Sequence, residues 1–142
     1  MTEFFQFFHF LGAAILVGGE LLIALMAIRA QDDDEALSFF VGFLRQIAVF
    51  MWVGTGLALV GGAGLAIVGD HGFPVAFVLK LVAFALVIVI SVLLGLRIPR
   101  VRAAAEQNLQ QVRADSNFRV MDLLSRANLV LVLVILVLSV VM

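Results

Sequence analysis

The chain contains no cysteine, which removes disulfides, thiolate metal ligands and covalent attachment of a c-type haem from consideration. Charge is scarce as well: Asp, Glu, Lys and Arg make up 13% of 142 residues, whereas 64% are hydrophobic and the mean hydropathy is +1.20. A soluble domain needs a polar exterior that this composition cannot provide. No basic face suggests nucleic acid, and phosphate-loop, dinucleotide, nucleophile-elbow and HExxH motifs are all missing. The composition therefore indicates an integral membrane protein.

Four long apolar segments alternate with the charged ones, at 4–28, 46–69, 72–96 and 120–142. A helix of that length crosses a hydrocarbon core of roughly 30 Å at ~1.5 Å per residue. The first segment is too long for a secretory signal and has no Lys or Arg before it, so we expect a retained helix. The sequence predicts an all-α fold, in which residues 1–142 form one bundle of four transmembrane helices in the lipid bilayer.

The arginines predict how this bundle is oriented. Arg29 and Arg45 belong to the first connection, and the third connection holds a larger set: Arg97, Arg100, Arg102, Arg113, Arg119 and Arg126. Both connections lie on one side of a four-span chain, and the other side has no Lys or Arg outside a helix. The positive-inside rule places the arginine-rich side in the cytoplasm, so that both termini face out. We expect a bacterial inner membrane.

Local signals predict helix ends outside the apolar segments. The acidic run at 32–35 is typical of a cap and first turn for the second helix, where the helix dipole favours negative charge. Pro74 suits the first turn of the third helix. Residues 101–128 are rich in Ala, Gln, Glu, Leu and Arg, which predicts that the fourth helix begins well before its apolar segment.

Small residues recur every four positions in the second apolar segment, at Gly54, Ala58, Gly62 and Ala66. Such a strip allows a neighbouring helix backbone, or a flat cofactor, to approach closely. Helix–helix packing is the more common explanation, and glycines alone do not indicate a macrocycle.

Polar residues inside the apolar segments are spaced eleven apart, which is about three helical turns or roughly 16 Å on one face. The pairs are His9 with Glu20, Lys80 with Ser91, and Asn128 with Ser139. In the predicted topology these pairs form two layers across the bundle. The outer layer contains His9, Lys80 and Ser139, and the inner layer contains Glu20, Ser91 and Asn128.

For the inner layer we expect a structural role. Glu20 is predicted to pair with Arg126 or Arg45, with help from Asn128, and a proton relay is the less common alternative. Ser91 and Asn128, and Ser139 in the outer layer, are predicted to form interhelical hydrogen bonds.

For the outer layer the residues leave several roles open. A neutral His9 could ligate a metal or haem iron, or hydrogen-bond to a neighbouring helix. Lys80 could hold a haem propionate, supply a second axial ligand, or extend toward the outer headgroups. His71 lies in the outer turn and could fold over such a site. Copper would have as ligands only His9, His71 and a terminal methionine, Met1 or Met142, which is a weak signal.

Several short segments together resemble one group of membrane proteins. They are His9-Phe-Leu-Gly12, Leu16-Val-Gly-Gly-Glu20 with Arg29 at the helix end, and Val78-Leu-Lys80-Leu. These are similar to copper-resistance-D-like membrane proteins and to the small four-helix protoporphyrinogen oxidases. The resemblance implies a four-helix fold with bound haem b, His9 as the haem ligand and Lys80 as its essential, catalytic partner.

Three functional hypotheses follow from the sequence. The first is haem b binding through His9, with electron transfer or porphyrin oxidation as the activity. The second is a non-catalytic subunit of a larger respiratory or photosynthetic membrane complex, or a homo-oligomer, because the chain is small and has little extramembrane mass. The third is copper transport.

Overall fold

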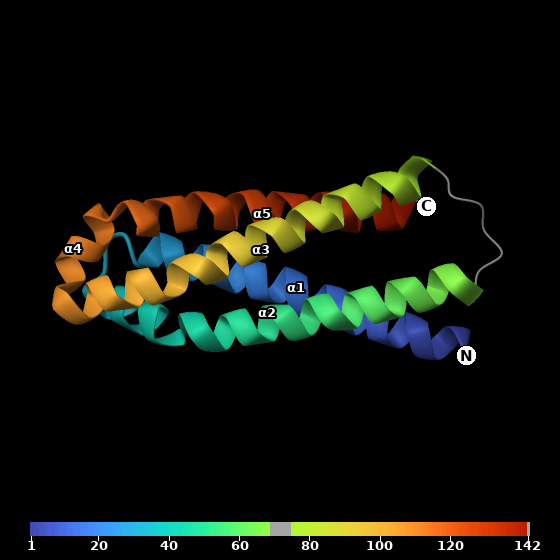
Figure 1. Ribbon diagram of the computed structural model, residues 1–142, viewed down its shortest axis with the longest axis horizontal. Helices are drawn as coiled ribbons and strands as arrows, with labels where there is room; N and C mark the ends of the chain where they lie inside the picture. Colours follow the sequence, from blue (N-terminus) through green and yellow to red (C-terminus); the bar gives the residue numbers. More distant parts are fainter. Residues whose placement is uncertain (69–74, 142) are drawn as a thin grey trace.

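The computed structural model describes residues 1–68 and 75–141 and is entirely helical over those ranges (Figure 1). The elements are α1 (Thr2–Arg29), α2 (Asp34–Val68), α3 (Val75–Gln107), α4 (Leu109–Ala114) and α5 (Ser116–Val141). All of them except the short α4 are long and apolar enough to cross a membrane. The protein is therefore an integral membrane protein with four spanning helices, as the apolar segments predicted.

The four long helices pack as a ring in the order α1, α2, α3, α5. The contact between α1 and α2 is by far the most extensive, followed by α3 with α5 and α1 with α5, whereas α2 touches α3 over a short stretch. Within the described residues no Cα atoms of α1 and α3, or of α2 and α5, lie within 8 Å of each other, so these pairs lie diagonally. Long side chains still meet across the bundle, as Phe40 of α2 and Phe118 of α5 do. Both chain ends lie at one end of the bundle, and α4 lies at the other with the arginine-rich connections (Figure 1).

The predicted acidic cap begins α2. Asp33 Oδ1 accepts hydrogen bonds from the backbone N–H groups of Glu35 (2.9 Å) and Ala36 (3.3 Å), which have no partner inside the helix. The helix thus starts at Asp34, about three turns before its apolar segment, and projects beyond the membrane-spanning region.

The prediction that the fourth helix begins well before its apolar segment is wrong: α5 begins at Ser116, about one turn before residue 120. The first part of 101–128 instead continues α3 as far as Gln107. Two side chains then interrupt the helix: Asn108 Oδ1 accepts from the N–H of Gln110 (2.9 Å), and Asp115 Oδ1 accepts from the N–H of Asn117 (2.6 Å). Asn and Asp favour such caps over helix interiors, so composition alone overestimated the continuity. Pro74 lies outside the described residues.

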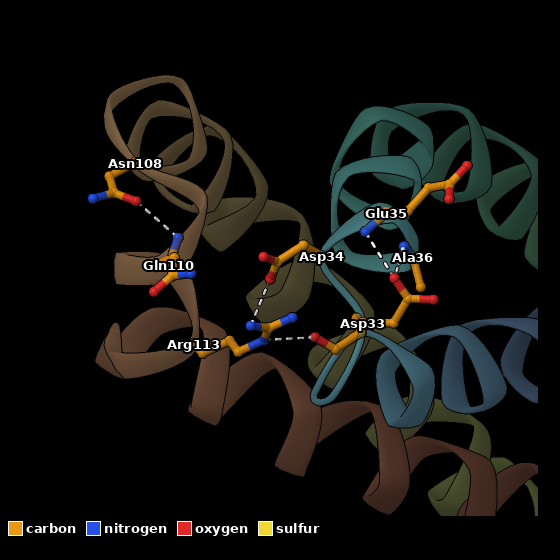
Figure 2. A network of polar contacts seen from close by, with 8 residues as sticks. Asp33, Asp34, Glu35, Ala36, Asn108, Gln110 and Arg113 are labelled. Carbon is orange, nitrogen blue, oxygen red and sulfur yellow. Dashed lines mark hydrogen bonds and ion pairs between the residues drawn. The ribbon is translucent and has the colours of Figure 1, made fainter.

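Figure 2 shows how the α4 end is joined to the first connection. Arg113 donates from Nε to the Ala30 carbonyl (3.0 Å) and forms an ion pair with Asp34 (2.7 Å). An apolar cluster fills the space between these elements and includes Leu37, Phe40, Val101, Val112 and Phe118. This end of the bundle is closed by a compact core rather than by loose loops.

The small-residue strip of α2 packs against α1, with a shift in its second half. Gly54, Ala58, Gly61 and Gly64 are buried, whereas Ala66 is exposed. Because an α-helix has 3.6 residues per turn, positions four residues apart move gradually off one face. The spacing of four and then three residues, from Gly54 to Ala58 and then to Gly61 and Gly64, stays on the face that contacts α1. A Cβ added at Gly61 would collide with the backbone of His9. The glycines serve helix packing, as the commoner explanation predicted.

Candidate functional site

The inner polar layer assembles as the spacing predicted. Glu20 on α1, Ser91 on α3 and Asn128 on α5 meet near the bundle axis. Asn128 Nδ2 donates to Glu20 Oε1 at 2.5 Å and lies 3.4 Å from Ser91 Oγ. Glu20 and Asn128 are 1% and 0% exposed, so a carboxyl group is held in the interior by an amide from a neighbouring helix.

The predicted ion pair of Glu20 with Arg126 or Arg45 is not formed in the described structure. Arg126 instead binds Asp122, one turn earlier on its own helix, with Nη2 2.9 Å from Oδ2 and Nε donating to Oδ1 at 3.1 Å. Its side chain is 53% exposed, and Arg45 is exposed as well. Both guanidinium groups stay toward the surface, because burying them beside Glu20 would cost the free energy of removing their solvation.

Three buried polar atoms around this layer have no hydrogen-bond partner within the described part of the chain. They are Glu20 Oε2, Asn128 Oδ1 and Ser125 Oγ. The eleven-residue spacing did not predict Ser125 as a member of this layer. It lies three residues before Asn128, however, and therefore on the same face of α5. Buried polar atoms normally find partners, so such a cluster indicates room for another molecule or for water.

A cavity lies beside Glu20 and Ser125, bounded by all four long helices. Its volume is about 50 Å³, and it is lined by Glu20, Ser91 and Ser125 together with mainly apolar side chains, among them Phe40, Met51, Trp52, Phe118 and Met121. We call it the inner cavity.

A second space between α2 and α3 adjoins the inner cavity. The two share four lining residues, which we call the α2–α3 window: Ala48, Trp52, Gly95 and Ile98. This outer space also borders Arg45, Arg102 and Glu106. These four residues therefore lie between the inner cavity and the outer space, where the contact between α2 and α3 is short.

The outer layer is built around His9 alone. Its Nδ1 lies 3.1 Å from the carbonyl oxygen of Ala58 on α2. Since a carbonyl oxygen can only accept, Nδ1 carries the hydrogen and Nε2 carries the free lone pair. Beside the half-buried imidazole is an apolar cavity of about 60 Å³, which is lined from α1, α2, α3 and α5 by residues that include Leu16, Phe84, Val87, Val132 and Ile135. We call it the His9 cavity.

The other residues predicted for the outer layer are not brought to His9 in the described structure. Lys80 is half-buried on α3, but it does not line the His9 cavity, and α3 does not contact α1. Ser139 is exposed and donates to the Ile135 carbonyl of its own helix (2.8 Å). His71 lies outside the described residues. Eleven-residue spacing thus predicted the depth of these side chains but not which helices would be neighbours.

Metal-binding clusters are also absent from the described ranges: no group of three or more His, Asp and Glu side chains is close enough to hold a metal ion. Within the described residues His9 is the one histidine that could bind copper, and no methionine lines the cavity beside it.

No protein-family model, no curated protein and no solved structure matches this chain. The candidate sites are therefore defined by their own chemistry: a solitary, oriented imidazole in an apolar cavity, and a buried carboxyl group in a larger cavity. Both sites are enclosed by the same four membrane-spanning helices, so the molecule is identified as a four-span helical membrane protein.

Proposed function

We propose that this membrane protein holds haem b through His9 and acts in electron transfer or porphyrin oxidation, with its arginine-rich end in the cytoplasm. The hydrogen bond from His9 Nδ1 to the Ala58 carbonyl carries this proposal. Histidines that bind metals usually donate their other ring N–H to a carbonyl or carboxylate, which fixes the ring and the tautomer. In that tautomer Nε2 is available to iron.

The surroundings of His9 fit a site with one protein ligand. The His9 cavity is almost entirely apolar, which suits a porphyrin ring. Haem would supply a one-electron redox couple there, and the chain would supply the imidazole of His9 and a water-poor environment. We assign no iron ligation to Lys80, because it does not line this cavity; binding a propionate at the cavity edge is the role that its ammonium could still perform.

An absorption spectrum of protein purified in mild detergent tests the proposal. The wild-type protein is expected to show a Soret band, and His9→Asn is expected to lose it. Asparagine keeps a donor near the position of Nδ1, so the bond to Ala58 can survive while the ligating Nε2 is removed. Glu20→Gln, at the other cavity, serves as the matched control and is expected to keep the band. A wild-type protein that remains colourless after reconstitution with haem would overturn the proposal.

A further inference from the structure

We propose that the inner cavity binds a lipophilic amine, whose protonated nitrogen contacts Glu20 and whose apolar body lies among the aromatic and methionine side chains. This inference does not depend on haem binding at His9. It rests on the buried groups that have no partner, on the lining of the cavity and on its opening between α2 and α3.

The unpartnered atoms determine what kind of ligand would be complementary. Two of them, Glu20 Oε2 and Ser125 Oγ, belong to residues that line the inner cavity. An ionised carboxyl group only accepts hydrogen bonds, and Ser125 Oγ can accept as well as donate. The site therefore has an excess of acceptors, which an ammonium group with its N–H donors satisfies. A quinone or a carboxylate, which brings mainly acceptors, would leave Glu20 Oε2 unsatisfied.

The rest of the lining favours an organic cation over a metal ion. Within the described residues the acidic groups nearby do not form a ligand cluster, and Asp122 is already paired with Arg126. The aromatic rings of Phe40, Trp52 and Phe118 border the same cavity and can contact a cation or an apolar body. Met51 and Met121 add flexible apolar side chains that adapt to ligands of different shape.

The α2–α3 window gives such a molecule a route from the lipid. Its four residues carry no charge, and Trp52 is 44% exposed beside it. Met51 lies against Gly19, next to Glu20 in sequence, and so marks the depth of the carboxyl group on α2. Arg45 lies six residues away from Met51, about 9 Å along the helix axis, toward the α4 end. Trp52 therefore lies closer than Arg45 to the depth of Glu20, and Glu106 places a carboxylate beside Arg45 and Arg102 in the outer space.

Binding of 1-aminoadamantane to the purified protein in mild detergent tests the proposal. Trp52 is the single tryptophan of the chain and borders the window, so its fluorescence reports occupancy directly. The uncharged 1-adamantanol is the matched ligand, because it has the same cage with a hydroxyl in place of the ammonium. We expect saturable binding of the amine, and binding at least about tenfold weaker for the alcohol.

Three variants decide which group is responsible. Glu20→Gln preserves size and can still accept from Asn128, and it is expected to weaken amine binding about tenfold or more. Glu3→Gln removes an exposed carboxylate from the same helix and is expected to leave binding unchanged. His9→Asn is also expected to bind the amine normally, which separates this proposal from haem binding.

Equal affinity for the amine and the alcohol would overturn the proposal, and so would undiminished amine binding by Glu20→Gln. If Glu20→Gln does not fold, Gly95→Leu replaces it, because a Cβ there meets no atom within 4 Å and the leucine side chain occupies the window. Unchanged association of the amine with that variant would overturn the route through the window.

Discussion

The two sides of α2 differ sharply. Toward α1 its surface is made of glycine and alanine, and the two backbones lie so close that an added Cβ at Gly12, Gly54 or Gly61 would collide with the facing helix. Toward α3 the contact is short, and a window of Ala48, Trp52, Gly95 and Ile98 opens onto the inner cavity. The same helix therefore forms one closed interface and one open one.

This difference shows how a small membrane protein can be rigid and still hold a cavity. In lipid, helices associate through close packing and interhelical hydrogen bonds rather than through exclusion of water. Here the close packing is concentrated between α1 and α2, whereas α1, α3 and α5 are joined through the polar contacts of Glu20, Ser91 and Asn128. The open side of α2 can then vary without unfolding the bundle.

The largest effect is expected from blocking the closed interface. In Gly61→Val the new side chain would meet the backbone of His9 and the Phe5 carbonyl, neither of which can move without separating α1 from α2. We expect a loss of about 1–3 kcal/mol in the free energy of unfolding, measured by denaturant titration in mixed micelles. Gly56→Val is the control, because a Cβ at exposed Gly56 meets no atom within 4 Å. Equal stability of the two variants would contradict the importance of this interface.

The next effect concerns the polar layer that joins the remaining helices. Asn128→Leu keeps the size of the side chain but removes the donor to Glu20, and leaves a buried carboxyl group without a partner. We expect a loss of about 1–2 kcal/mol, since interhelical hydrogen bonds in membranes are of this order or smaller. Ser139→Ala is the matched control, because this exposed hydroxyl bonds only to its own helix. If both variants unfold at the same denaturant concentration, the Glu20–Asn128 bond does not stabilise the bundle.

How much of this could be predicted from the sequence depends on the kind of information required. The number of spans follows from hydropathy, and the meeting of Glu20, Ser91 and Asn128 follows from a spacing of eleven, because both depend on helix geometry alone. The cap at Asp33 follows from local chemistry in the same way.

Other features depend on which helices become neighbours, and a single sequence does not encode that by spacing. His9 and Lys80 have similar depths, but they lie on diagonal helices, α1 and α3, which have no Cα atoms within 8 Å of each other in the described structure. Arg126 had two acidic candidates, and the local one, Asp122, is favoured because it needs no burial of charge. The inner cavity could not be predicted, since it results from the short contact between α2 and α3.

A smaller effect is expected where the α4 end is joined to the first connection, outside the spanning segments. Arg113→Met removes both the hydrogen bond to the Ala30 carbonyl and the ion pair with Asp34. The side chains of this ion pair are partly exposed, Arg113 at 28% and Asp34 at 55%. Because solvent screens this pair, we expect a loss of about 1 kcal/mol or less, most of it absent at high salt. Titrations at low and high salt, with exposed Arg100→Met as the control, measure it. A loss of several kcal/mol would mean that this end, and not the α1–α2 interface, limits stability.

The smallest change in stability is expected on the open side of α2. A Cβ at Gly95 meets no atom within 4 Å, so Gly95→Leu is expected to alter the free energy of unfolding by less than about 0.5 kcal/mol. The leucine nevertheless fills the α2–α3 window, so access of 1-aminoadamantane to Trp52 is expected to slow or cease. Stability and ligand access would then respond to glycine substitutions on two different helices, Gly61 of α2 at the α1–α2 interface and Gly95 of α3 at the α2–α3 window. A Gly95→Leu protein as unstable as Gly61→Val would show instead that α2 and α3 also depend on close approach, and that the window is not free space.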